Sequence, residues 1–266
     1  MRVAALYDIH GNLPALEAVL KELQPVTIDQ IVVGGDMLSG PMQAECIERL
    51  RTQSVPVQYL MGNSDREVIA ARHGEEKKNL PPFALEILRW SARQLAPEHE
   101  QWIMRWPKTV SLQIAPLGSV LFCHATPRDD NEIFTTLTDE NRLLPIFEAA
   151  NADVVVCGHT HMQFDRMVGK TRVVNAGSVG MPFGPPGADW LLLGPGIDLR
   201  HTQYDRDSAR RLIATTKFPN ASQFDMLNPP AAEKMLELYS RAELKTQASG
   251  NRRSNDRPIR KVKQRG

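Results

Sequence analysis

The stretch Cys157-Gly158-His159-Thr160-His161 directly follows three consecutive valines at positions 154–156. An apolar run that stops at a small residue and then carries two histidines is typical of a buried strand that ends at a polar site. Residues two apart in extended chain point to the same side, so His159 and His161 can serve one site. The alternative interpretation of this stretch alone is a pair of hydrogen-bonded loop histidines.

Four other segments also place polar side chains directly after a short apolar run. They are Leu6-Tyr7-Asp8-Ile9-His10, Val32-Val33-Gly34-Gly35-Asp36, Leu60-Met61-Gly62-Asn63-Ser64-Asp65 and Leu121-Phe122-Cys123-His124. Ligands of open α/β sheets collect outside the carboxyl ends of the strands. We therefore expect one polar site at that edge, built from seven side chains: Asp8, His10, Asp36, Asn63, His124, His159 and His161.

The order of the predicted elements indicates an α/β fold with two sheets. Residues 2–61 alternate short strands and helices, which is typical of a mostly parallel sheet. Residues 66–107 are helical in pattern, and we expect this insertion to pack over the site. The second half contains several hairpin patterns and is expected to be mostly antiparallel. These features predict two sheets stacked face to face with helices outside.

The C-terminal region differs in composition from the rest of the chain. We expect one domain over residues 1–204, a helical extension over 205–248 that includes a loosely attached arm, and a disordered basic tail over 249–266. Residues 250–266 carry seven Lys or Arg and one Asp, whereas the whole chain has a net charge of +1. The body is therefore slightly acidic, which argues against a broad nucleic-acid surface on it. The tail could bind RNA or an acidic partner, or it is simply solvated chain.

Composition indicates a cytoplasmic protein. The chain has 42% hydrophobic and 24% charged residues, and no apolar stretch approaches the ~18 residues of a membrane span. Its N-terminus has no signal-peptide pattern. The three cysteines, Cys46, Cys123 and Cys157, match neither a disulfide framework nor a zinc knuckle. We expect them to be small buried residues in a reduced compartment, and we expect no membrane partner.

The seven polar side chains have the chemistry of a metal site. Mixed imidazole and carboxylate ligation suits Mn, Fe, Zn or Ni better than Ca or Mg. Seven ligands are too many for one catalytic metal with an open position, but they suffice for two metals that share a carboxylate. Two metals about 3.5–4 Å apart lower the pKa of a bridging water and neutralise phosphoryl oxygens during in-line attack. The chain has no G-x-S-x-G elbow and no P-loop, so no side-chain nucleophile stands out.

The motifs D-x-H, G-D, G-N-x-D, H and G-H-x-H occur here in the order in which they occur in the calcineurin-like metallophosphoesterases. The sequence resembles this family from Met1 to about Tyr204. Two further segments, Asn175-Ala176-Gly177-Ser178-Val179-Gly180 and His124-Ala125-Thr126-Pro127-Arg128-Asp129, are similar to segments of its bacterial phosphodiesterase branch. That branch includes diadenosine tetraphosphatases. The resemblance implies a four-layer α-β-β-α sandwich of two mixed sheets with flanking helices.

The resemblance also implies how two metals divide the ligands. Metal one would be held by Asp8, His10, Asp36 and His161. Metal two would be held by Asp36, Asn63, His124 and His159, so that Asp36 bridges the two. Asn63 can also contact a phosphate oxygen. We expect two divalent ions, manganese first, with iron, nickel or zinc as alternatives.

Ser64 departs from the family pattern. Many members have a histidine at this position that helps the leaving group depart, and a serine cannot act as a general acid near neutral pH. General acid catalysis contributes about 10²–10⁴-fold, so we expect substrates with good leaving groups, such as nucleotides or aryl phosphates. We treat Asn63 and Ser64 as the catalytic positions. Three further residues follow ligand motifs and could hold phosphate or form ordinary loop contacts: Arg66, Thr126 and Arg128.

We therefore expect a metal-dependent phosphoric ester hydrolase that acts on phosphodiesters or (di)nucleoside polyphosphates. The attacking group would be a metal-bridging hydroxide, and the partner a small-molecule phosphodiester or nucleotide. One alternative is a phosphomonoesterase of the protein Ser/Thr phosphatase kind, against which Ser64 counts. The other is a scaffold that keeps the fold with weak or no turnover.

Overall fold

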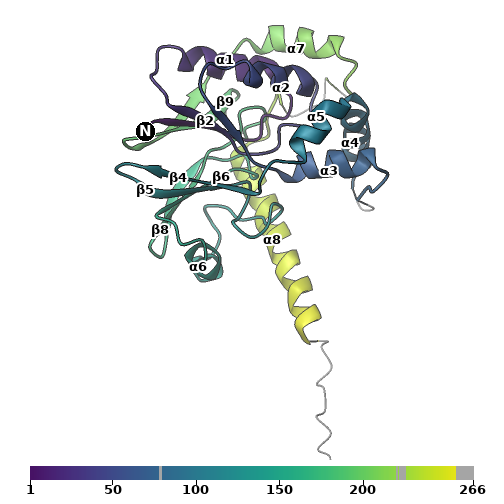
Figure 1. The fold of residues 1–266 in the computed structure, drawn as a ribbon. Coiled ribbons are helices and arrows are strands. Elements are labelled where there is room, and N and C mark those ends of the chain that lie inside the picture. Colours follow the sequence, from purple (N-terminus) through teal and green to yellow (C-terminus); the bar gives the residue numbers. More distant parts are fainter. Residues whose placement is uncertain (78–79, 220, 222–225, 256–266) are drawn as a thin grey trace, which may run out of the picture.

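The computed structural model describes residues 1–77, 80–219, 221 and 226–255 of the chain. Two five-stranded sheets lie face to face, and helices cover their outer sides (Figure 1). This arrangement confirms the predicted α/β fold with two mixed sheets. Among the described residues, no helix combines the length and the apolar character that crossing a membrane requires.

The first sheet has the strand order β10-β9-β1-β2-β3. Its strands are β1 (Val3–Leu6), β2 (Gln30–Val33), β3 (Val57–Tyr59), β9 (Ala188–Leu193) and β10 (Ile197–Thr202). Strands β1, β2 and β3 are parallel, as predicted from their alternation with helices. The β9–β10 hairpin extends this sheet, because β9 pairs antiparallel with β1.

The second sheet has the strand order β4-β5-β6-β8-β7. Its strands are β4 (Thr109–Ile114), β5 (Gly118–Cys123), β6 (Val154–Cys157), β7 (Phe164–Val168) and β8 (Thr171–Asn175). The hairpins β4–β5 and β7–β8 are antiparallel, as expected. The second half of the chain is mostly antiparallel, as predicted, but the central strand β6 runs parallel to both of its neighbours. The hairpin patterns revealed the local pairings but not the long-range ones.

The described residues form eight helices. They are α1 (Leu13–Leu23), α2 (Gln43–Arg51), α3 (Asn63–Arg72), α4 (Pro82–Gln94), α5 (Pro97–Ile103), α6 (Glu140–Glu148), α7 (Arg206–Thr215) and α8 (Ala232–Asn255). Helices α3, α4 and α5 make up the expected helical insertion. That this insertion packs over the site stays a prediction, as does the domain boundary at residue 204.

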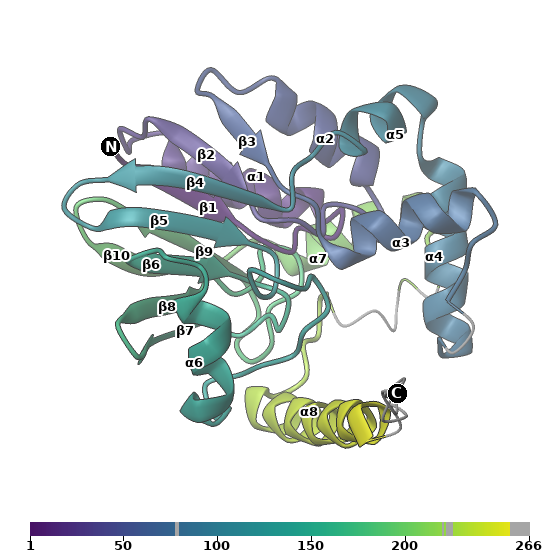
Figure 2. The same ribbon diagram turned by 60° about the horizontal axis from the view of Figure 1, so that its bottom comes forward.

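Alternation along the strands divides the apolar interior into layers. In β1, Ala4 and Leu6 belong to the cluster that packs beneath α1, whereas Val3 and Ala5 face the second sheet. A third cluster packs α6 against the outer face of β6 and β8. The two sheets thus share a buried interface, and the carboxyl ends of β1, β2, β5 and β6 come together at one edge of it (Figure 2).

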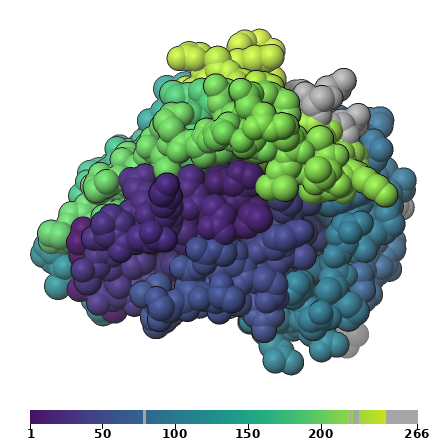
Figure 3. All heavy atoms as spheres, turned by 90° about the horizontal axis from the view of Figure 1, so that it is seen from above, coloured from purple at the N-terminus to yellow at the C-terminus, as the bar shows by residue number. Residues whose placement is uncertain are grey.

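The two C-terminal helices contact the body to different extents. Helix α7 contributes Ala209 and Ile213 to a small apolar cluster with Met42, and Figure 3 shows this green region beside the purple N-terminal residues. Helix α8 contacts the body where the buried carboxylate of Glu243 binds Thr138 and Arg142, and Figure 1 shows its far end projecting away from the two sheets. The loose attachment that we expected stays a prediction. Helix α8 also runs on to Asn255, so it includes residues 249–255 of the expected tail, whose disorder stays a prediction. An existing helix gains one backbone hydrogen bond for each residue added, which favours its continuation. The first proline after the start of α8 is Pro258. The rest of the predicted tail, 256–266, lies outside the described residues.

Candidate metal centre

The seven expected ligands follow the strand ends. Asp8 and His10 follow β1, Asp36 follows β2, and Asn63 is the first residue of α3. His124 follows β5, while His159 and His161 follow β6. Five of the seven have a positive φ: Asp8 (52°), His10 (46°), Asp36 (53°), His159 (66°) and His161 (57°). Non-glycine residues in this region cost about 1–3 kcal/mol each, and such strain clusters at functional sites.

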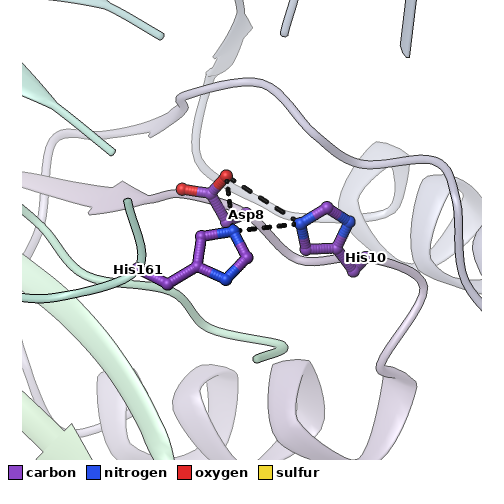
Figure 4. A group of neighbouring side chains, drawn as sticks. All are labelled: Asp8, His10 and His161. Carbon is purple, nitrogen blue, oxygen red and sulfur yellow. Dashed lines mark hydrogen bonds and ion pairs between the residues drawn. The ribbon is translucent and has the colours of Figure 1, made fainter. Parts of the chain in front are cut away.

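The first group of ligand atoms comes from Asp8, His10 and His161, and these atoms lie within 4.8 Å of one another. Figure 4 shows the three side chains pointing at one position. The Nε2 atoms of His10 and His161 are 3.2 Å apart, and Asp8 Oδ1 is 3.3 Å from the latter and 3.9 Å from the former. The Nδ1 atoms of the two rings face the carbonyl oxygens of Leu38 and Met181, to which they can only donate. Both Nε2 atoms then carry lone pairs, and a cation between them would satisfy both.

The second group comes from Asp8, Asp36 and His124. His124 Nε2 lies 3.4 Å from Asp36 Oδ1, 3.9 Å from Asp8 Oδ1 and 2.9 Å from Asn63 Oδ1. The other oxygen of Asp36 is 3.8 Å from His10 Nε2, so this carboxylate spans the space between the two groups. Asp8 belongs to both groups.

His159 lies at the edge of this arrangement. Its ring centroid is 5.2 Å from that of His124, in a T-shaped contact. Its backbone N–H donates to Asp8 Oδ2, at 2.8 Å. The ring of His159 thus lies beside the second group of ligand atoms, but His159 is not a member of that group.

One buried oxygen supports the fit of this site to a metal. Asp8 Oδ1 is buried and accepts no hydrogen bond from the residues that the structure describes. A buried carboxylate oxygen without a donor or cation is costly. Because three imidazole nitrogens surround this oxygen at 3.3–3.9 Å, the donor set has the composition of a transition-metal site.

Electrostatics keep the carboxylates ionised. Burial by itself would raise the pKa of Asp8 and of Asp36, but the neighbouring histidines lower both below the ordinary value. Burial lowers the pKa of His159 to about 4, with a further contribution from His124. His124 is the exception: burial lowers its pKa, but Asp36 raises it to about 10. A metal would therefore compete with a proton for His124 Nε2.

Asp65 holds the loops that carry the ligands. Its Oδ2 accepts the backbone N–H of Asp36 at 2.9 Å and of Gly62 at 3.0 Å, and its Oδ1 accepts that of Leu38 at 2.9 Å. Burial and the charge of Asp36 raise the pKa of Asp65 to about 7. We did not predict this role, although Asp65 is the last residue of the G-N-x-D motif.

Two residues of the segment 175–180 hold the ligand turns from the other side. The Asn175 amide donates to the carbonyl oxygen of Gly158 at 2.7 Å and to Thr160 Oγ1 at 3.1 Å. The Ser178 hydroxyl donates to the Asp8 carbonyl oxygen at 2.7 Å. The similarity of this segment to the family pattern was the available signal, although it did not reveal these bonds.

The backbone of Ser64 and the side chains of the three expected substrate contacts form hydrogen bonds within the chain. The backbone N–H of Ser64 donates to Asp36 Oδ1 at 2.8 Å, while its hydroxyl is buried and has no partner among the described residues. Arg66 forms two hydrogen bonds with Asp130, and both Thr126 and Arg128 bind Glu132. These three residues line a cavity of about 110 Å³ beside His124, together with Lys108, Pro127, Asp129 and Asp130. A phosphate there would compete with the carboxylates, and the role of these residues in substrate binding stays a prediction.

Comparisons with known proteins agree with the fold. An uncharacterized protein of Methanocaldococcus jannaschii is 25% identical over 244 residues, which cover 82% of this chain and 93% of the relative. A hypothetical protein from Pyrococcus horikoshii OT3 shares the fold with a TM-score of 0.71 at 18% identity, over 82% of this chain and 94% of that one. A metallophosphoesterase from Sphaerobacter thermophilus does so with a TM-score of 0.65 at 23% identity, over 85% and 99%.

The family match spans all seven expected ligands. The match to the calcineurin-like phosphoesterase superfamily domain covers residues 1–193. This range contains every strand of the two sheets except β10. Its members are metal-dependent phosphoesterases, and the clustered carboxylates and imidazoles are candidate metal ligands of that kind. The chain therefore belongs to the calcineurin-like phosphoesterase superfamily.

Proposed function

We propose that the protein is a phosphodiesterase that uses two divalent cations held by the seven side chains at the strand ends. The observation that carries this proposal is the meeting of the Nε2 atoms of His10, His124 and His161 around the unpartnered Oδ1 of Asp8. Each of these rings turns its Nδ1 to a backbone carbonyl oxygen. Such outer contacts orient a histidine for metal binding through Nε2.

Asp36 is the proposed bridging ligand. Its Oδ2 faces His10 at 3.8 Å and its Oδ1 faces His124 at 3.4 Å, which supports one oxygen for each cation. Asp8 Oδ1 lies between the same two histidines, so we propose that Asp8 can also be shared. Asn63 and His159 would complete the second cation's shell. Manganese is the proposed ion, because it accepts mixed nitrogen and oxygen ligation.

The residues of the chain define which esters suit this site. When bound, two cations would activate a water and neutralise the oxygens of a phosphoryl group. The Asn63 side chain faces the centre and can contact a phosphate oxygen. Ser64 offers no general acid near neutral pH, and its hydroxyl is buried. We therefore propose phosphodiesters and (di)nucleoside polyphosphates, whose leaving groups depart readily, as substrates.

The substitution Asp36→Asn tests the proposal. We expect it to lower Mn²⁺-dependent hydrolysis of bis-4-nitrophenyl phosphate by about 100-fold or more, since even the partners of metal ligands contribute 10–100-fold. Metal content, measured by plasma emission, should fall, while circular dichroism stays unchanged. Asp198→Asn is the matched control, because this carboxylate is exposed and, among the described residues, pairs with Arg200 alone. Unchanged turnover in Asp36→Asn would refute the assignment.

A substrate panel distinguishes the proposal from its alternatives. We expect the wild-type protein to hydrolyse bis-4-nitrophenyl phosphate and diadenosine tetraphosphate faster than 4-nitrophenyl phosphate. The panel should be run with Mn, Ni, Fe and Mg. A preference for the monoester would favour a phosphomonoesterase. Absence of hydrolysis with all four ions, together with low metal content, would favour a scaffold.

A further inference from the structure

Three aromatic rings connect the metal centre to the C-terminal helix. The ring of Phe183 stacks on that of His161, with centroids 5.0 Å apart and planes at 25°. The ring of Tyr239, on α8, lies 6.2 Å from that of Phe183 at an angle of 48°. Tyr239 therefore lies one ring away from an expected metal ligand.

Contacts on both sides of Tyr239 fix the orientation of α8. One turn further along the helix, the carboxylate of Glu243 accepts hydrogen bonds from Thr138 and from Arg142, both at 2.8 Å. Before the helix, the Pro230 carbonyl oxygen accepts the backbone N–H of Gly184, the residue after Phe183. Figure 2 shows the first turns of α8 beside α6. Because residues four apart share a helix face, Tyr239 and Glu243 point to the same side, toward the body.

The hydroxyl group of Tyr239 is free to bind a ligand. It forms no hydrogen bond with another residue of the described part of the chain, although the side chain is half-buried. Burial, followed by the charges of Asp8 and Asp36, raises the pKa of Tyr239 above its ordinary value. The hydroxyl thus stays protonated and can donate a hydrogen bond.

The hollow beside α8 offers room for an extended substrate. A cavity of about 330 Å³ is lined by Arg142 and Glu243 at the α6–α8 contact and by Arg128 and Asp129. The last two residues also line the cavity of about 110 Å³ next to His124. An ester bound at the centre could therefore extend along α8.

We propose that Tyr239 is a substrate-contacting residue, whose hydroxyl donates a hydrogen bond to an oxygen of a phosphoryl group bound at the metal centre. Helix α8 forms a wall of the substrate site in this arrangement. The inference rests on the proposed function, because it needs a phosphate ester at the centre. It adds a residue from outside the part of the chain that matches the family domain, which ends at residue 193.

The test compares Tyr239→Phe with Leu238→Ala. The first substitution removes only the hydroxyl, and the second alters an exposed neighbour on α8, 47% accessible, as a control. A hydrogen bond to a charged group contributes enough for about a 10-fold or greater loss of kcat/KM toward bis-4-nitrophenyl phosphate in Tyr239→Phe. The inhibition constant of inorganic phosphate should rise by a similar factor. Metal content should match that of the wild-type protein, and Leu238→Ala should behave as wild type.

Calorimetric titration of the manganese-loaded proteins with inorganic phosphate provides a second reading that does not depend on turnover. Weaker binding to Tyr239→Phe than to the wild-type protein supports the contact. Equal phosphate binding and equal kcat/KM would overturn the role of Tyr239 while the proposed function stands. An equal loss in Leu238→Ala would also overturn it, because the effect would then belong to the helix. A wild-type protein that neither binds phosphate nor hydrolyses any ester would refute the proposed function itself.

Discussion

A buried carboxylate, that of Asp65, holds the loops that carry candidate metal ligands, although Asp65 is not itself an expected ligand. Asp65 accepts three backbone N–H groups, from Asp36, Leu38 and Gly62. These bonds join the loop after β2 to the start of α3. They hold Asp36 in its left-handed conformation, with φ of 53°.

The substitution Asp65→Asn should therefore destabilise the protein. An amide has one acceptor oxygen, so its NH₂ group would face at least one backbone N–H, and a buried donor would lose its partner. We expect the free energy of unfolding, measured in urea, to fall by about 1–3 kcal/mol. The exposed control Asp198→Asn should change it by less than about 0.5 kcal/mol. Equal stability of the two variants would show that the three bonds do not hold the loops.

At this scale the sequence indicated which side chains cluster at the strand ends better than it indicated the residues that support them. Asp8, Asp36 and the histidines each follow an apolar run, so their pattern is local. The bonds that Asp65 and Ser178 make to backbone groups depend on the path of loops far away in sequence. Both residues lie in family motifs, but a motif does not show which backbone groups its polar side chains bind.

Among the elements, α8 makes a contact with the body that its sequence does not indicate. Its helical pattern is plain, but its attachment depends on Glu243 and Arg142, which are 101 residues apart. Local hydrophobic spacing predicts local elements, such as a helix or the hairpin of β4 and β5. Local spacing has no bearing on an ion pair between distant segments, so the contact of Glu243 with Arg142 was not predicted.

The substitution Glu243→Gln should loosen α8 without unfolding the body. It removes the charge that Arg142 and Thr138 bind, while Arg142 keeps its contact with Glu132. A charged, largely buried hydrogen-bonded pair is strong enough that we expect trypsin to cleave α8 after Arg241 about five-fold faster or more. Mass spectrometry of the fragments measures this rate. Glu237→Gln is the control, because Glu237 is exposed and pairs with Arg241 on the same helix. Equal rates in the two variants would contradict the anchoring role of Glu243.

In the whole molecule, the site forms where two sheets meet. The order of strands and polar motifs predicted two stacked sheets and a common edge, because parallel strands bring their carboxyl ends together. It could not predict that His10 and His161, 151 residues apart, bring their Nε2 atoms to 3.2 Å. That distance depends on how the sheets stack, and so do the places of Asp8 in both ligand groups and of His159 at the edge.

Cations at this junction would tie the two sheets together. Asp8, His10 and Asp36 come from the first sheet, whereas His124 and His161 come from the second. An ion that binds only the folded chain stabilises it by about 2.7 kcal/mol at 100 times its Kd. Since 1 kcal/mol corresponds to about 2–4 °C in a domain of this size, saturating Mn²⁺ should raise the Tm in calorimetry by about 5–10 °C, and EDTA should reverse the shift. Asp198→Asn should keep this shift and Asp36→Asn should lose most of it, because the proposed bridging carboxylate is gone. A full shift in Asp36→Asn would place the stabilising ion elsewhere on the chain.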